Sequence, residues 1–152
     1  HTKSPDEMTV VGLVGELLTL IEILNIDPRG LGAWHGPDSD RHDFRAGTVT
    51  IEVKTSLGAD RNRIHINGIR QLESEPSDNL LIRHVRIEPD PDGSLSVPDL
   101  VAEAAIGAHC QKLDTQFLQF RILDGHGRQF RRSDEGEIAG IEADYHPLTS
   151  IV

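Results

Sequence analysis

Apolar and polar positions alternate most strictly in residues 49–54, which read Val-Thr-Ile-Glu-Val-Lys. This period of two is typical of a half-buried strand with its apolar residues on one face. The other face then presents Glu52 and Lys54, an acid and a base two residues apart. Because Ala46 and Gly47 suit a tight turn, we expect residues 42–45 to pair with this strand as a β-hairpin.

The predicted hairpin brings a second carboxylate toward Glu52. If Ala46 and Gly47 form the loop, Asp43 lies opposite Thr50 and diagonal to Glu52. Diagonal neighbours have Cβ atoms about 7–8 Å apart. Two carboxylates can close this gap around one cation that lies about 2.0–2.1 Å from each ligand oxygen. The hairpin therefore predicts a magnesium site next to Lys54.

A long helical pattern precedes the hairpin. Ser4 suits an N-cap and Pro5 a first helical position, and we expect the helix to run to about Asn25. Its small and polar residues form one narrow stripe and are Gly12, Gly15, Glu16, Thr19 and Glu22. This stripe has two interpretations: it faces solvent, or its glycines make room for a bulky ligand backbone and Glu16 is an extra metal ligand.

The other segments alternate between strand and helix patterns. In chain order these are a loop at 28–41 with a short strand near Gly32–His35, a strand at Arg61–Asn67, a helix at Gly68–Glu75 carrying Gln71, a strand at Asn79–Glu88, and a helix from Pro98 to about His109. The last forty residues predict a strand or helix at Phe117–Leu123 and strands at Gln129–Arg132 and Ile138–Tyr145. This order predicts an α/β fold.

Length and composition limit the possibilities further. At 152 residues, the chain fits one domain, with a core at about 8–110 and a C-terminal extension at about 111–152. Polar residues interrupt the apolar run Val10–Ile26, so we expect no membrane span, and the single Cys110 suits a reducing cytoplasm. Since the first residue is His1 rather than methionine, we also expect the chain to be a trimmed piece.

The spacing of the polar residues resembles that of the PD-(D/E)XK nuclease superfamily: Glu16, then Asp43-x8-Glu52-x-Lys54, then Gln71. More narrowly, several strings resemble a bacterial family of PD-(D/E)XK proteins encoded near restriction and phage-defence genes. They are Gly12-Leu13-Val14-Gly15-Glu16-Leu17, Gly36-Pro37, His42-Asp43-Phe44, Ile51-Glu52-Val53-Lys54 and Gln71-Leu72. The resemblance implies a restriction-endonuclease-like core, a central mixed β-sheet flanked by helices.

The chain departs from these patterns in two places. His42 stands where the superfamily label has proline, and Asn67-Gly68 stands where small hydroxyl residues are expected in the narrower family. The second departure puts a backbone contact to phosphate in doubt at that position.

The resemblance also implies roles for individual residues. Asp43 and Glu52 would bind Mg²⁺, for which Mn²⁺ can substitute, with the backbone carbonyl of Val53 as a third ligand. Lys54 would orient or deprotonate the attacking water, or stabilise developing charge. Two further residues assist: Glu16 in the metal shell or with a second ion, and Gln71 by fixing Lys54 or the water.

The substrate is indicated less directly, because a net charge of −10 argues against nucleic-acid binding by bulk attraction. Three local clusters could contact phosphates or be ordinary surface residues: Arg61, Arg63, His65 and Arg70; Arg83, His84 and Arg86; and Arg128, Arg131 and Arg132. Eight histidines could suggest zinc, but His35, His42 and His65 lie on separate predicted elements without close ligand spacing.

These features together predict a metal-dependent endonuclease that cuts DNA in a restriction or phage-defence system. It would act as a homodimer or with other defence subunits. One alternative is a catalytically inactive PD-(D/E)XK domain that binds nucleic acid or a partner protein. Another is a structural subunit in which the hairpin serves only for packing, with Asp43 and Glu52 buried far from any cleft.

Overall fold

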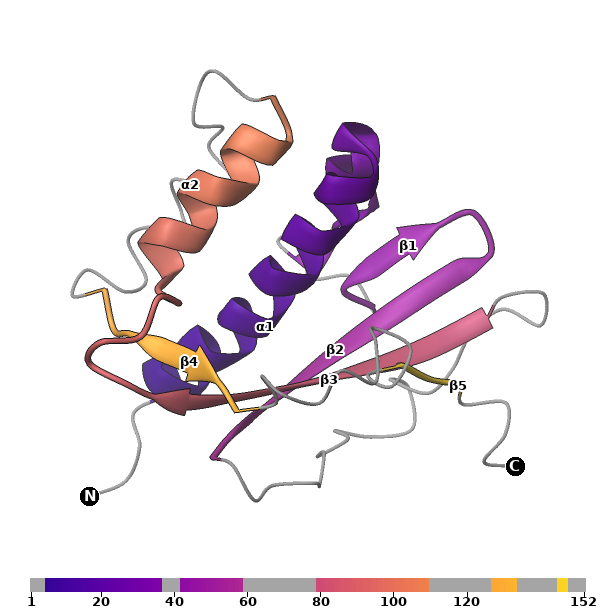
Figure 1. Ribbon diagram of the computed structural model, residues 1–152. Helices are drawn as coiled ribbons and strands as arrows, with labels where there is room; N and C mark the ends of the chain where they lie inside the picture. Colours follow the sequence, from indigo (N-terminus) through magenta and orange to yellow (C-terminus); the bar gives the residue numbers. More distant parts are fainter. Residues whose placement is uncertain (1–4, 37–41, 59–78, 110–126, 134–144, 148–152) are drawn as a thin grey trace.

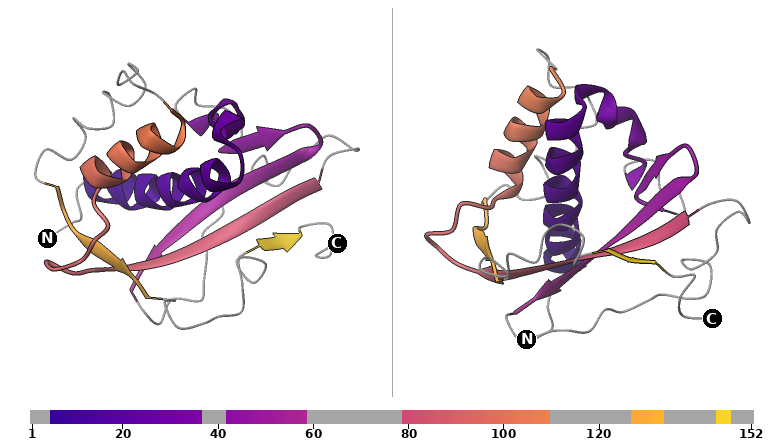
Figure 2. Two further views of the ribbon diagram at one scale, coloured as in Figure 1. Left: turned by 45° about the horizontal axis from the view of Figure 1, so that its top comes forward. Right: turned by 45° about the vertical axis from the view of Figure 1, so that its right-hand side comes forward.

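The computed structural model describes residues 5–36, 42–58, 79–109, 127–133 and 145–147. In these parts of the chain, two helices cover one face of a mixed β-sheet (Figure 1). The long helix α1 (Pro5–Ile26) lies on the sheet, and α2 (Val97–Gly107) packs beside it, as both views of Figure 2 show. This arrangement confirms the predicted α/β class and the mixed sheet flanked by helices.

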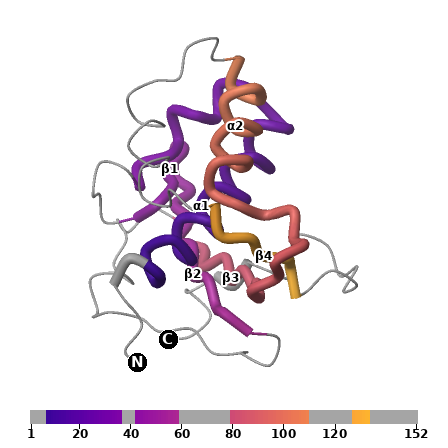
Figure 3. The backbone as a smooth tube through the Cα atoms, turned by 90° about the vertical axis from the view of Figure 1, so that its left-hand side faces the viewer, coloured from indigo at the N-terminus to yellow at the C-terminus, as the bar shows by residue number. Residues whose placement is uncertain are grey.

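The sheet is built around two long parallel strands, β2 (Val49–Leu57) and β3 (Asn79–Pro89). The short strand β1 (Phe44–Ala46) pairs antiparallel with β2. On the other edge of β3, β4 (Phe130–Arg132) and β5 (Tyr145–Pro147) pair antiparallel with its two ends. Leu95, just before α2, exchanges two backbone hydrogen bonds with Phe130, so β4 lies beside the start of α2 (Figure 3).

The predicted hairpin is present, but its turn lies one residue later than expected. Ala46 pairs with Val49 and Phe44 with Ile51, which leaves Gly47 and Thr48 as the loop. Gly47 has a φ of 59°, a left-handed conformation that glycine adopts without strain. The register differs by two residues from the predicted one, so every side chain keeps its face.

The centre of the polar stripe of α1 faces inward, which corrects the solvent-facing interpretation there, whereas a methyl group added at Gly12 would have no atom within 4 Å. Gly15 is buried, and a methyl group there would overlap the Thr55 side chain of β2. Thr19 is also buried and its hydroxyl donates to the Gly15 carbonyl at 2.9 Å. Gly15 therefore makes room for β2 rather than for a ligand.

The length and composition of Glu7–Ile26 would be sufficient for a membrane span. In this structure, the stretch forms the central helix of the core, and its buried apolar residues include Val14, Leu17 and Leu24. Burial against the sheet and α2 accounts for its apolar character, because a helix covered on most sides needs few polar residues.

The strand β3 contains a charged residue at its centre. Arg83 is fully buried and shares a face with Val85 and Ile87, whereas Leu80 and Ile82 are buried on the opposite face. Leu81, expected in the core, is only half-buried. The guanidinium of Arg83 is paired with Glu22 of α1, a partner that the strand pattern alone could not indicate.

Two other predicted segments differ in detail. Residues 28–41 were expected to be a loop with a short strand; instead η1 (Pro28–Ala33) is a 3₁₀ helix, followed by an isolated bridge between Trp34 and Phe44. The helix predicted from Pro98 begins at Val97, capped by the Ser96 hydroxyl, which accepts from the Asp99 backbone at 3.3 Å. The predicted elements at Arg61–Asn67, Gly68–Glu75 and Phe117–Leu123 lie outside the described residues, as does nearly all of Ile138–Tyr145.

Candidate active site

Asp43 stands where β1 and β2 diverge. Its backbone carbonyl accepts from the His35 N–H at 2.7 Å, which connects the end of η1 to the hairpin. Its carboxylate accepts from the Val53 N–H at 2.8 Å, at the place where the backbone pairing with β1 has ended. Continuing the observed register by one residue sets Asp43 opposite Glu52, one step closer than the diagonal position predicted.

Glu52 and Lys54 lie on the same face of β2, as the alternation predicts. Lys54 Nζ is 3.2 Å from Glu52 Oε1, and the side chains are 16% and 7% exposed, respectively. The low exposure of both side chains distinguishes this pair from an ordinary surface ion pair. Glu52 Oε2 is also buried and receives no hydrogen bond from the part of the chain that the structure describes.

Glu16 completes the group from α1. Trp34 Nε1 donates to Glu16 Oε2 at 3.0 Å, so Trp34 is both a core residue and a donor that positions this carboxylate. Gly36 lies so close that a methyl group there would overlap the Glu16 carboxylate. Reasoning from the sequence missed this role of Trp34. The single tryptophan, two residues before Gly36, is the sequence signal that could have suggested a contact with the site.

The three carboxylates change one another's ionisation. Burial raises the pKa of Asp43 to about 8, with further increases from the charges of Glu16 and Glu52, opposed by the Val53 N–H and Lys54. Burial likewise raises the pKa of Glu16, while hydrogen bonds from Trp34 and with Asp43 lower it. At neutral pH the raised pKa of Asp43 therefore favours its protonated form, because like charges at close range cannot all ionise.

Val53 offers a backbone oxygen at the same place. In a β-strand, the N–H and C=O of one residue point to the same side. Since the Val53 N–H points at Asp43, its carbonyl points to that edge of β2 as well. This direction suits the ligand role that the resemblance implies for Val53.

The residues present fit a divalent cation by their chemistry. Oxygen donors of this kind suit Mg²⁺ and Mn²⁺, and the buried Glu52 Oε2 is an acceptor that lacks a hydrogen-bond donor among the described residues. In the described ranges, however, no three His, Cys, Asp or Glu side chains already form a closed metal-binding group. Binding of a cation here would therefore compete with protonation of Asp43.

Several other predicted site residues either lie outside the described residues or are paired with acidic side chains. Gln71 and the cluster Arg61, Arg63, His65 and Arg70 lie outside the described residues. Arg83 was grouped with possible phosphate contacts, but its side chain is 1% exposed and bound to Glu22, so it is not a surface contact. Arg131 pairs with Glu88 and lies 3.8 Å from Asp90, which offsets its charge.

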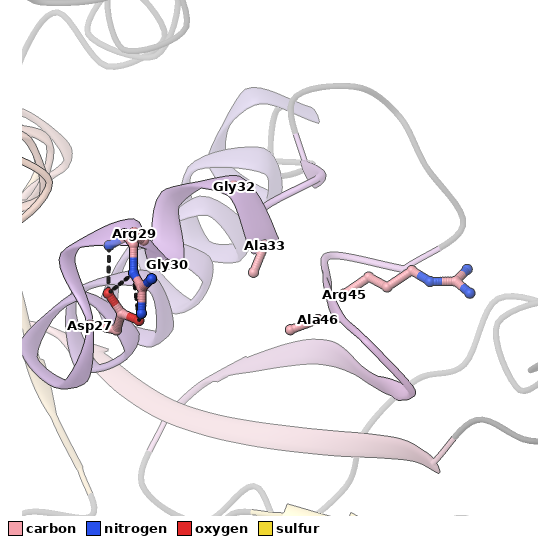
Figure 4. Close-up of a pocket in the computed structure, with 7 residues that line it drawn as sticks. All are labelled: Asp27, Arg29, Gly30, Gly32, Ala33, Arg45 and Ala46. Atoms are coloured by element: carbon pink, nitrogen blue, oxygen red, sulfur yellow. Dashed lines mark hydrogen bonds and ion pairs between the residues drawn. The ribbon is translucent and has the colours of Figure 1, made fainter.

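A cavity of about 430 Å³ lies between η1 and β1 (Figure 4). Its walls include the small residues Gly30, Gly32, Ala33 and Ala46. Asp27 accepts hydrogen bonds from Arg29 within it, whereas the Arg45 side chain extends away from that pair. None of the residues predicted for the site lines it.

An α/β domain that brings an E-x-K strand, a preceding aspartate and a helix glutamate together has the features of a PD-(D/E)XK nuclease-like domain. The chain belongs to the family described as "Putative PD-(D/E)XK family member, (DUF4420)", whose model matches residues 1–127. No curated protein and no solved structure matches the chain. Family membership confirms the resemblance to PD-(D/E)XK proteins and indicates a nuclease-like domain.

Proposed function

We propose that this protein is a divalent-metal-dependent endonuclease that hydrolyses DNA phosphodiester bonds in the bacterial cytoplasm, as part of a restriction or phage-defence system. It would act as a homodimer or with other subunits of that system. The observation that carries the proposal is the convergence of Glu16, Asp43, Glu52 and Lys54 from three elements. Family membership supports the same reaction class.

The proposed centre holds Mg²⁺ or Mn²⁺ through Asp43, Glu52 and the Val53 carbonyl. Glu16 completes the shell or supports a second ion. A bound divalent ion would lower the pKa of a water and neutralise charge on the phosphate. The acidic residues alone would repel that phosphate, which gives the cation a second purpose in a chain of net charge −10.

Lys54 is the residue proposed to act on the attacking water or on the developing charge. Glu52 holds its Nζ at 3.2 Å, and the low exposure of both side chains limits where the ammonium group can point. A positioned cation in a poorly hydrated site stabilises negative charge far better than one in bulk water. Gln71 would fix Lys54 or the water from the following segment.

The test is cleavage of plasmid and linear DNA by the purified chain in Mg²⁺, Mn²⁺ or EDTA. We expect metal-dependent cutting, reduced at least a hundredfold in Lys54→Ala, which removes a group acting on the reacting atoms. Glu103→Gln changes an exposed glutamate of α2 and serves as the matched surface control. A folded wild-type chain that cuts nothing under any metal condition would contradict the proposal.

An inactive domain that binds nucleic acid or a partner protein is the second candidate. The raised pKa of Asp43 favours it, because a protonated carboxyl group is a poor metal ligand. DNA retention in a gel-shift assay without cutting, unchanged by EDTA and by Lys54→Ala, would support this candidate instead.

A further inference from the structure

His42 lies beside the carboxylate group although its position in the sequence suggested no ligand. Its side chain is 9% exposed, and its Nδ1 is 3.7 Å from Glu52 Oε2. This separation is too long for a hydrogen bond between nitrogen and oxygen. The histidine therefore faces the glutamate across a short gap.

The gap has a size that an ion can bridge. Metal bonds to imidazole nitrogen and carboxylate oxygen are each about 2.0–2.1 Å long, so two ligands of one ion lie up to about 4.2 Å apart. Glu52 Oε1 is engaged by Lys54, which leaves Oε2 as the oxygen directed at His42. That oxygen is buried and receives no hydrogen bond from the described residues.

We propose that His42 Nδ1 is a nitrogen ligand of the same divalent ion as Glu52, so that the centre selects Mn²⁺ and similar transition metals over Mg²⁺. The inference rests on the metal site of the proposed function and adds the ligand that sets its preference. Imidazole suits transition metals, whereas Mg²⁺ takes almost only oxygen ligands. Neither the number of histidines nor their spacing in the sequence indicated that His42 lies near Glu52. The two residues are close because the hairpin register brings residue 42 beside residue 52.

The experiment measures Mn²⁺ bound to the purified protein by electron spin echo envelope modulation, which detects nitrogen directly coordinated to the ion. We expect ¹⁴N modulation in the wild-type chain and its replacement by the ¹⁵N pattern after ¹⁵N-histidine labelling. His42→Ala should lose the modulation and bind Mn²⁺ at least tenfold more weakly in calorimetry, with a much smaller change for Mg²⁺.

The control is His109→Gly, which removes an exposed histidine at the end of α2. Its φ of 56° favours glycine, so this variant should fold and retain both the modulation and the affinity. If His42→Ala does not fold, His42→Gln, which keeps a polar side chain without the imidazole, is measured in its place.

Each outcome separates this inference from the proposed function. Mn²⁺ that binds the wild-type chain and is lost in Glu52→Gln, but shows no nitrogen modulation, overturns the role of His42 and leaves the metal site standing. Equal Mn²⁺ affinity in wild type and folded His42→Ala overturns it in the same way. No Mn²⁺ binding to the wild-type chain overturns both.

Discussion

The ionisation of Asp43 is decided by its surroundings. An isolated aspartate has a pKa near 3.8, whereas burial and two neighbouring carboxylates raise it to about 8 here. A group in this state destabilises the folded chain whenever it is ionised. A cation bound in place of the proton would offset this cost of burying the ionised carboxylate, since metal binding and folding are linked.

This pKa predicts how stability depends on pH. Between about pH 4 and 8 the folded state holds a proton at Asp43 that the unfolded state has lost, so the free energy of unfolding falls as pH rises through this window. Asp43→Asn keeps an oxygen for the Val53 N–H and removes the titration. We expect the variant to be more stable than wild type at pH 8 by a few kcal/mol, at about 1.4 kcal/mol per pKa unit before discounting for coupling.

Urea unfolding at pH 5, 6.5 and 8 without metal measures the effect. Asp92→Asn, at an exposed turn, is the matched control and should follow the wild-type curve. Parallel pH profiles for Asp43→Asn and wild type would refute the raised pKa.

At the scale of elements, the contact between α1 and β2 positions the site. Gly15 lets the helix approach Thr55 and Val53, and the next residue, Glu16, then reaches the carboxylate group. A glycine in a helix interior costs about 1 kcal/mol relative to alanine, so its presence here reflects the close approach.

Substitution of this glycine tests the packing. Gly15→Ala places a methyl group against Thr55, and we expect a loss of about 1–3 kcal/mol in the free energy of unfolding, as for other overpacked cores. Gly12→Ala lies on the same helix with nothing within 4 Å of the added atom and should gain up to about 1 kcal/mol. Chemical denaturation of both variants checks the difference; equal effects would show that the helix does not approach the strand closely.

At the scale of the whole molecule, a buried ion pair connects the helix α1 to the sheet. Arg83 of β3 is held by Glu22 of α1, and Arg132 of β4 lies 3.7 Å from the same glutamate. Removing one partner leaves an uncompensated buried charge, whereas replacing both by apolar residues often costs little.

We therefore expect Glu22→Ala to lower the free energy of unfolding by up to about 3–5 kcal/mol, toward the lower end because the Glu22 side chain is 28% exposed. Glu22→Leu combined with Arg83→Met should recover most of the loss. Arg29→Ala breaks the exposed Asp27–Arg29 pair, keeps the backbone N–H that Asp27 caps, and serves as a control with little effect. A Glu22→Ala variant as stable as this control would contradict the role of the pair; thermal and urea unfolding give the comparison.

Local patterns in the sequence were sufficient to predict α1, the hairpin and β3. Period-two alternation, a glycine turn and a long apolar run depend on neighbours within a few residues, and each predicted element formed. The side chains of Glu52 and Lys54 share a face for the same reason, because alternation along a strand fixes direction before any tertiary contact is made. The predicted hairpin also brought Asp43 toward Glu52, whereas the stripe of the first helix gave Glu16 as a metal ligand in only one of its two interpretations.

What the sequence determined by itself was therefore α1, the hairpin, β3 and the faces on which the E-x-K residues stand. Tertiary packing decided the rest: the inward direction of the Gly15–Glu16 stripe, the burial of Arg83, the proton near Asp43 and the approach of His42 to Glu52. These properties depend on distances between residues far apart in the chain and on exclusion of water, which no local pattern encodes.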